Sequence, residues 1–243
     1  MATAGARTEN AAERIDRVLT RAILRGTFAP GTNLPTVRDL AADHDVNPAT
    51  VQRALARLES RGLVTARQGS GLRVNDPAEA GDLSLVPDWL AATDDDPDRA
   101  AAILADLLEV RRVMAARLIA RHRLEVLDAI GDLKADASNL LVVPADQVWQ
   151  ADIEFARTVI RATGNTVAAA VLNSLARALA ELPVLVDAMY DEPARNVGAM
   201  LTVLAAVRDG GADLAEQIDK AMLLVDDHTV QTFRRLLTEA ADR

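Results

Sequence analysis

Residues 34–74, LPTVRDLAADHDVNPATVQRALARLESRGLVTARQGSGLRV, decide the fold of the first third of this 243-residue chain. Pro35 suits the first position of a short helix, and Asn47-Pro48 marks the start of a second one, because Asn caps free N–H groups and Pro tolerates the first helical position. Gly62 is placed to end that helix. Residues 63–67 and 72–74 predict two short strands around a Gly-rich hairpin. This order of elements is typical of a winged helix-turn-helix.

The second helix of this stretch has two different faces. Val51, Ala54, Leu55 and Leu58 form one apolar stripe, which predicts a face packed inward. The opposite face is small, polar and basic, which suits close approach to the major groove of DNA, where Gln pairs with adenine and Arg with guanine. The residues that we expect on it are Ala49, Thr50, Gln52 and Arg53.

An amphipathic helix is predicted before this stretch, over about residues 8–25. Ala11, Ile15, Val18 and Ala22 recur at helical spacing and form its expected inner face. Gly26 is placed to end it, and the turn Pro30-Gly31 leads into the next helix.

Residues 34–74 resemble the N-terminal domain of the GntR family of bacterial transcription regulators. Within it, NPATVQR at 47–53 is more similar to the YtrA and HutC branches than to the FadR branch. The resemblance implies contacts with operator DNA through the start of one helix, the next helix and the hairpin tip. The residues at those positions are Arg38, Asn47, Ala49, Thr50, Gln52, Arg53, Gln68, Gly69 and Ser70.

Charge is divided unevenly along the chain, whose net charge is −9. Residues 1–75 hold 11 Arg against 7 Asp and Glu, a balance of +4, and the remainder holds 16 Lys and Arg against 29 Asp and Glu, a balance of −13. A basic N-terminal module on an acidic body fits a protein that meets phosphate at one end only. The chain contains no cysteine, and it has neither a secretory leader nor an apolar run of membrane-spanning length, so we expect a cytoplasmic protein.

The rest of the chain predicts helices only. Residues 76–98 form a Pro- and Asp-rich connector with a short helix over 83–92, and residues 99–243 an all-helical bundle. The expected fold class is therefore mainly α, with a winged helix-turn-helix over 1–75 and a small hairpin wing. The expected helices of the bundle cover residues 98–122, 124–138, 145–162, 165–181, 193–209 and 212–240.

The bundle is similar to the helical FCD domain of the FadR branch. This resemblance rests on the order and spacing of short strings: LLEVR at 107–111, DIEFA at 152–156, ATGN at 162–165, PAR at 193–195 and GGAD at 210–213. It implies a ligand-responsive regulator that binds a palindromic operator as a homodimer. The effector implied is an acyl-CoA or fatty acid, or a small organic acid.

Three polar residues of the bundle lie on stripes that are otherwise apolar: Arg111, Asp152 and His228. A charged group on a buried stripe must be paired, neutralised or directed at a ligand, because its desolvation is costly. We therefore predict an effector pocket at these residues, with Arg111 pairing an anionic oxygen. The alternative is an internal Arg111–Asp152 salt bridge in a bundle that serves only as a scaffold for dimerisation and partner docking.

No metal or other cofactor is expected. Many FCD domains bind a metal through one Asp and three His, and Asp152 matches the Asp, but Ala156 replaces the next His and only His228 remains for the others. One Asp and one imidazole make a poor transition-metal site. With three scattered His and no constellation of catalytic residues, an enzyme is not expected either.

Overall fold

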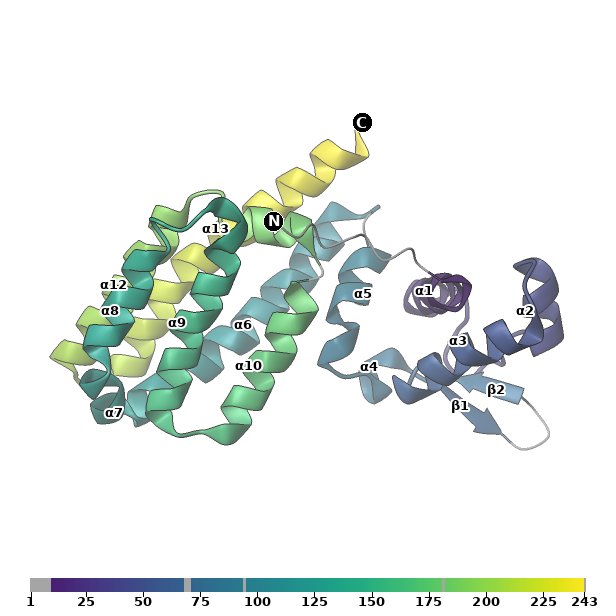
Figure 1. Ribbon diagram of the computed structural model, residues 1–243, viewed down its shortest axis with the longest axis horizontal. Helices are drawn as coiled ribbons and strands as arrows, with labels where there is room; N and C mark the ends of the chain where they lie inside the picture. The colour runs from purple at the N-terminus through teal and green to yellow at the C-terminus, as the bar shows by residue number, and fades with distance from the viewer. Residues whose placement is uncertain (1–9, 68–70, 94, 181, 243) are drawn as a thin grey trace. The chain divides into compact units, whose positions relative to one another are not determined.

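The computed structural model describes residues 10–67, 71–93, 95–180 and 182–242. Contacts divide the chain into two compact units, Met1–Thr93 and Asp94–Arg243. The sheet of the described residues has two antiparallel strands, and helices make up the rest of the regular structure (Figure 1). The predicted fold class, a winged helix-turn-helix followed by a helical bundle, is confirmed.

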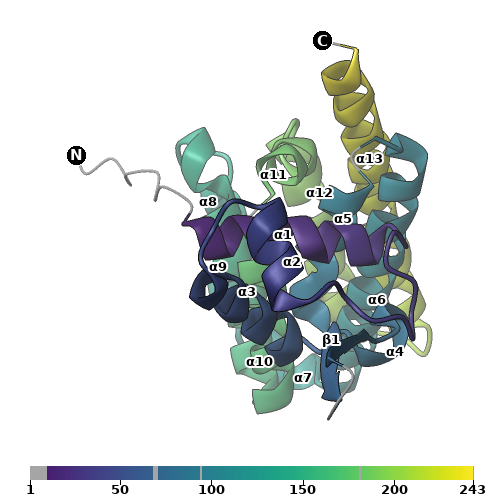
Figure 2. The same ribbon diagram turned by 90° about the vertical axis from the view of Figure 1, so that its right-hand side faces the viewer.

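The first unit contains the predicted helix-turn-helix and hairpin. Asn47 caps the second helix of the motif: its Oδ1 accepts a hydrogen bond from the backbone N of Thr50 at 2.9 Å, and Pro48 follows at the first helical position. The elements are α1 Ala11–Leu24, α2 Val37–Asp43, α3 Pro48–Ser60, β1 Val64–Arg67 and β2 Gly71–Val74. Figure 2 labels the three helices and β1, and Figure 1 labels both strands.

The inner face of α1 differs from the prediction. Ala11 and Val18 are exposed, whereas Ile15 is buried as expected. The two alternative stripes share Ile15, and the one that carries larger aliphatic side chains removes more apolar surface from water. The buried residues of the helix are Ala12, Ile15, Leu19, Thr20 and Ile23.

The segment expected as a connector contributes a helix to the first unit. It forms α4 (Pro77–Ala80), the 3-10 turn η1 (Leu83–Leu85) and α5 (Val86–Ala92), and Leu85 belongs to the first unit's core. Arg61 at the end of α3 forms ion pairs with Asp88 of α5 and Asp16 of α1. Burial raises the pKa of both carboxyl groups, although Arg61 opposes the shift.

The second unit is a helical bundle. Its helices match the predicted ones, with two exceptions. Residues 124–138 divide at Ala129, and Pro183–Met189 forms a helix absent from the prediction. The elements are α6 Pro97–Arg121, α7 Arg123–Asp128, α8 Ile130–Asn139, η2 Ala145–Gln147, α9 Val148–Thr163, α10 Thr166–Leu179, α11 Pro183–Met189, α12 Pro193–Asp209 and α13 Leu214–Ala241.

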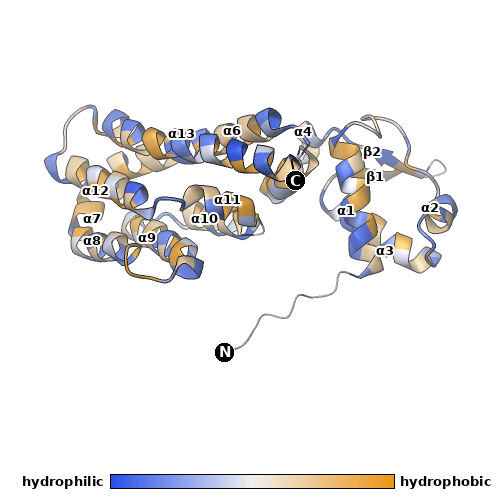
Figure 3. Ribbon diagram, turned by 90° about the horizontal axis from the view of Figure 1, so that it is seen from above, coloured by the Kyte–Doolittle hydropathy of each residue, from blue (hydrophilic) through white to orange (hydrophobic). Residues whose placement is uncertain are grey.

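The two longest helices of this bundle, α6 and α13, pack against each other. They run side by side in opposite directions (Figures 1 and 3). Ion pairs link the two helices in this orientation: Asp98 near the start of α6 contacts Arg234 near the end of α13, and Arg112 contacts Asp219. Blue and orange segments alternate along both helices in Figure 3, so each helix mixes hydrophilic and hydrophobic residues.

Candidate nucleic-acid interface and polar cluster of the helical unit

The outward face of α3 is the candidate nucleic-acid interface. Ala49, Gln52 and Arg53 are exposed there, opposite the buried stripe of Val51, Ala54, Leu55 and Leu58. The described residues offer the Gln52 side chain no hydrogen bond, and Arg53 contacts only the Thr50 hydroxyl, at 3.4 Å. The start of α3 thus presents small and polar groups that are free to contact a ligand.

Thr50 does not lie on this outward face, contrary to the prediction. Only 6% of its surface is exposed, because it lies one turn before Ala54 at the edge of the inward stripe. Its hydroxyl donates to Asn47 Oδ1 at 3.0 Å and accepts from Arg53. Thr50 therefore holds Asn47 and Arg53 in place, and Asn47 itself is engaged as the cap of α3.

Arg38 on α2 and Arg67 at the end of β1 extend the basic surface. Both are exposed, and neither forms an ion pair with a described residue. Gln68, Gly69 and Ser70, the predicted hairpin tip, lie outside the described residues.

A cluster of paired charges lies between α6 and α13 of the second unit. Arg111 donates to Asp226, and Arg112 contacts Asp219 at 2.8 Å and the other oxygen of Asp226 at 3.3 Å. The Asp226 side chain is only 5% exposed. Burial raises the pKa of Asp226, and the two arginines oppose that shift.

Asp152 on α9 has a different partner from the one that the sequence suggested. Its carboxylate accepts a hydrogen bond from the Tyr190 hydroxyl, at the end of α11. Burial raises the pKa of Asp152, which this hydrogen bond and the nearby charge of Arg111 partly offset. The Arg111–Asp152 salt bridge of the scaffold alternative is therefore not observed, and Arg111 pairs with Asp226 instead.

His228 follows Asp226 on α13 and contacts Asp191, with 2.9 Å between Nε2 and Oδ1. Thr232, one turn later, donates to the other oxygen of Asp191. Arg111, Asp152 and His228 thus each have a polar partner. The three pairs lie close together, because the charge of Arg111 acts to lower the pKa of both Asp152 and Tyr190, and Tyr190 directly precedes Asp191 in the chain.

One hydrogen-bond donor of this cluster has no acceptor among the described residues. This donor is the buried Nε of Arg111. A buried donor without a partner costs free energy, so this nitrogen is the unsatisfied group of the cluster.

Sequence patterns did not identify the partners of these three residues. Asp226 follows Val225, which occupied the expected apolar stripe, although Asp226 also fits the helical spacing of the buried Thr229 and Phe233. Tyr190 and Asp191 lie between two helices, where periodicity gives no signal.

Comparison with known proteins places both units in families. Residues 11–74 match "Bacterial regulatory proteins, gntR family" and residues 106–224 match the FCD domain. An HTH-type transcriptional regulator of Mycobacterium tuberculosis, named as uncharacterized (Rv0494), is 30% identical over 239 residues, which cover 95% of this chain and 91% of that protein. The chain belongs to the GntR family. It is therefore a DNA-binding transcription regulator and not an enzyme.

Two further relatives carry functional names. The transcriptional repressor NanR of Citrobacter rodentium is 26% identical and covers 84% of this chain and 79% of its own length. The fatty acid metabolism regulator protein of Edwardsiella ictaluri is 29% identical, over 66% of this chain and 65% of its own length. A solved structure described as Lar, which controls the Listeria monocytogenes agr system, shares the fold, with a TM-score of 0.54 at 15% identity, and covers 95% of this chain and 99% of its own.

The residues of this GntR protein do not fit the metal site of other FCD domains. Asp152 is engaged by Tyr190, His228 by Asp191, and Ala156 has no donor atom. In the part of the chain that the structure describes, no group of three or more His, Cys, Asp and Glu is placed to hold a metal ion. None of the described helices combines the length and the apolar character that a membrane crossing requires.

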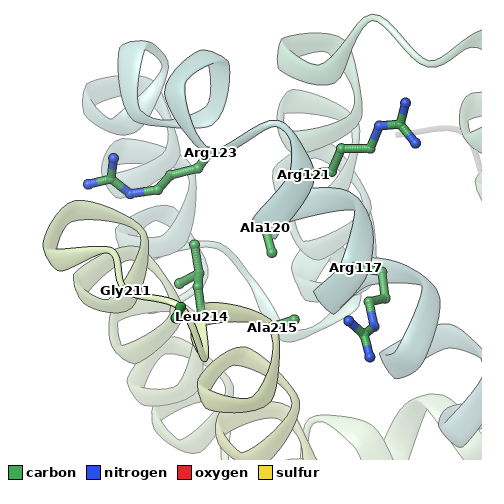
Figure 4. Close-up of a pocket in the computed structure, with 8 residues that line it drawn as sticks. Arg117, Ala120, Arg121, Arg123, Gly211, Leu214 and Ala215 are labelled. Atoms are coloured by element: carbon green, nitrogen blue, oxygen red, sulfur yellow. The ribbon is translucent and has the colours of Figure 1, made fainter.

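A pocket of about 480 Å³ lies at the end of the bundle, away from the polar cluster, where α6 ends and α13 begins. Arg117, Arg121 and Arg123 line it, but their side chains diverge: Figure 4 shows Arg123 extending away from the other two. Because the guanidinium groups do not converge on one point, they do not form a single site for an anionic effector.

Proposed function

We propose that this GntR protein is an effector-responsive regulator that binds a palindromic operator as a homodimer. Residues 1–75 bind DNA, and residues 99–243 dimerise and bind the effector, whereas most of the expected connector, 76–98, packs in the first unit. A regulator of bacterial DNA acts in the cytoplasm, which fits the chain's composition. The observation that carries the proposal is the free polar face at the start of α3, within residues 1–75, whose charge balance is +4.

The contacts with DNA are expected from three places in the first unit. Gln52 and Arg53 lie where α3 enters the major groove, and Ala49 permits close approach of the helix. Arg38 and the hairpin tip (Gln68, Gly69 and Ser70) contact the phosphate backbone. Asn47 and Thr50 support DNA binding by holding the start of α3 in place. Asn47 is also exposed, so it can contact DNA directly.

The test of DNA binding uses a duplex selected from random-sequence DNA by the full chain. Arg53→Ala is expected to weaken binding to this duplex by about 1–3 kcal/mol, measured by fluorescence anisotropy, because a base contact is lost. Arg161→Ala is the matched control, since Arg161 is exposed in the second unit and its removal changes the net charge equally. Equal affinities of the two variants would remove Arg53 from the interface.

For the effector, we propose an organic anion whose oxygen binds Arg111, with Asp152 and His228 at the same site. The unpartnered Arg111 Nε supports this site, because an incoming carboxylate, thioester or phosphate oxygen would satisfy it. The fatty acid regulator among the relatives favours an acyl-CoA or a fatty acid, and a small organic acid is the alternative.

Native mass spectrometry of the purified chain tests this site, together with thermal shift measurements against a series of acyl-CoAs and of short-chain carboxylic acids. A bound species or a stabilising compound is expected for the wild type and not for Arg111→Ala. A compound that stabilises both proteins equally binds elsewhere and would contradict the assignment of Arg111.

A second candidate function is a scaffold without a small-molecule effector. The ion pair of Arg111 with Asp226 favours it, because a satisfied charge pair can be purely structural. This function predicts that none of the compounds shifts the melting temperature and that Arg111→Ala changes stability only.

A further inference from the structure

The exposed side of α6 carries apolar residues that nothing in the described structure covers. Val110 is 56% exposed, Val113 48% and Met114 45%. They lie on one side of the helix, opposite the residues that pack on α13, such as Leu104 and Leu108. A group of large apolar side chains exposed on one helix marks an interaction surface.

Charged residues flank this apolar centre in an ordered way. Asp106 and Glu109 precede it, and Arg117 and Arg121 follow it. At about 100° per residue, positions 106, 110, 113, 114, 117 and 121 fall within an arc of about 100°. The side therefore runs from acidic through apolar to basic over about 22 Å.

The two arginines lack carboxylate partners among the described residues, and Asp106 and Glu109 likewise lack cations. This is unexpected in the acidic part of the chain, where carboxylates outnumber cations by 29 to 16. Arg117 and Arg121 are also four positions apart on one helix, where like charges repel. An external partner with an acidic group opposite Arg121 would reduce that repulsion.

We propose that this side of α6, from Asp106 to Arg121, is the surface on which a second copy of the chain docks, with the two α6 helices antiparallel. A two-fold axis between positions 113 and 114 brings Val113 and Met114 of both copies together. It places Asp106 opposite Arg121 of the second copy, and Val110 opposite Arg117 of the second copy. The pattern is thus complementary to itself, as a two-fold interface requires. This inference rests on the proposed homodimer and specifies its surface.

The first test introduces a charge at the axis. Val113→Glu places two carboxylates against each other, so the dimer dissociation constant, measured by sedimentation equilibrium, is expected to rise about a hundredfold. Val142→Glu is the matched control, because Val142 is 78% exposed and lies in the turn after α8. This control is expected to leave the dimer intact.

A charge exchange tests the register without touching apolar residues. Asp106→Arg and Arg121→Asp are each expected to weaken the dimer, and the double variant to restore it, because each pair then regains opposite charges. These surface variants decide the question if Val113→Glu fails to fold. Restoration supports the antiparallel arrangement.

The outcomes separate this surface from the proposed dimer itself. A wild-type chain that is monomeric at micromolar concentration overturns both. A wild-type dimer that survives Val113→Glu and both charge reversals overturns the α6 surface and leaves the homodimer standing. A dimer that Val142→Glu disrupts as strongly also overturns it.

Discussion

The polar side chains of the first unit's α3 are exposed and largely unpaired, whereas those between α6 and α13 of the second unit are paired and mostly buried. On α3 of the first unit, Gln52 and Arg53 are outside and almost free, held only by the contact of Arg53 with Thr50. Between α6 and α13 of the second unit, Arg111 and Arg112 are largely inside and paired with Asp226 and Asp219. A free outward group is available to a large ligand such as DNA, whereas a paired inward group links the helices of the bundle. The following variants test this difference, from the largest expected effect to the smallest.

The largest effect is expected from Asp226→Ala. It leaves Arg111 and Arg112 without their shared carboxylate, and breaking a buried pair by removing one partner costs about 3–5 kcal/mol of unfolding free energy. Urea denaturation of the second unit measures it. Asp209→Ala, which removes an exposed carboxylate from the same unit, is expected to leave the transition unchanged. Equal urea transition midpoints for the two variants would show that the ion pairs of Asp226 do not stabilise the fold.

Tyr190→Phe tests the second inner pair and its dependence on pH. Loss of the hydrogen bond to Asp152 is expected to cost about 1.5–3 kcal/mol at pH values where Asp152 is ionised. Burial raises the pKa of Asp152 above its ordinary value of 3.8, so its ionised form destabilises the fold. That penalty is complete above the raised pKa and disappears below 3.8.

The variant raises this pKa further, since the tyrosine hydrogen bond lowers it. The difference in stability between Tyr190→Phe and the wild type should therefore shrink as the pH falls toward 3.8. A difference that stays constant between neutral and acidic pH would contradict this coupling. Thermal denaturation at a series of pH values provides the measurement.

Two variants of Asn47, on the outer face of α3, distinguish its role as helix cap from a contact with DNA. Asn47→Ala removes the cap of α3 and is expected to cost about 1 kcal/mol of stability. Asn47→Asp keeps the cap, so its stability should equal that of the wild type, while its negative charge should weaken DNA binding severalfold. If Asn47→Asp binds the selected duplex as tightly as the wild type, the start of α3 does not approach phosphate.

The smallest effect concerns Arg38. If it contacts one phosphate, Arg38→Ala should reduce the slope of log affinity against log salt concentration by about 1, without changing which sequence is preferred. A changed sequence preference would instead indicate a base contact. Anisotropy titrations at several salt concentrations provide the slope.

The first unit was the more predictable from sequence because its signals are local. Asn47-Pro48, Gly62 and the spacing of Val51 to Leu58 each act within one helix or its ends. The wrong predictions there place the buried face of a helix slightly off its true position. Thr50 and Val18 both lie near the boundary between the buried and the exposed face of their helices. In the second unit, the sequence pattern singled out Arg111, Asp152 and His228 as polar residues on apolar stripes, but their partners come from other segments of the chain. No local pattern identifies Asp226 or Tyr190 as those partners.

Selection from random-sequence duplex DNA, with the wild type and Arg53→Ala in parallel, tests the central claim most directly. We expect the wild type to enrich an inverted repeat, because two copies of α3 read two half-sites, and Arg53→Ala to lose the preference at one position of each half-site. Enrichment of the same motif by both proteins, or of no repeated motif by the wild type, would contradict the assignment of α3 as the DNA-reading face of a homodimer.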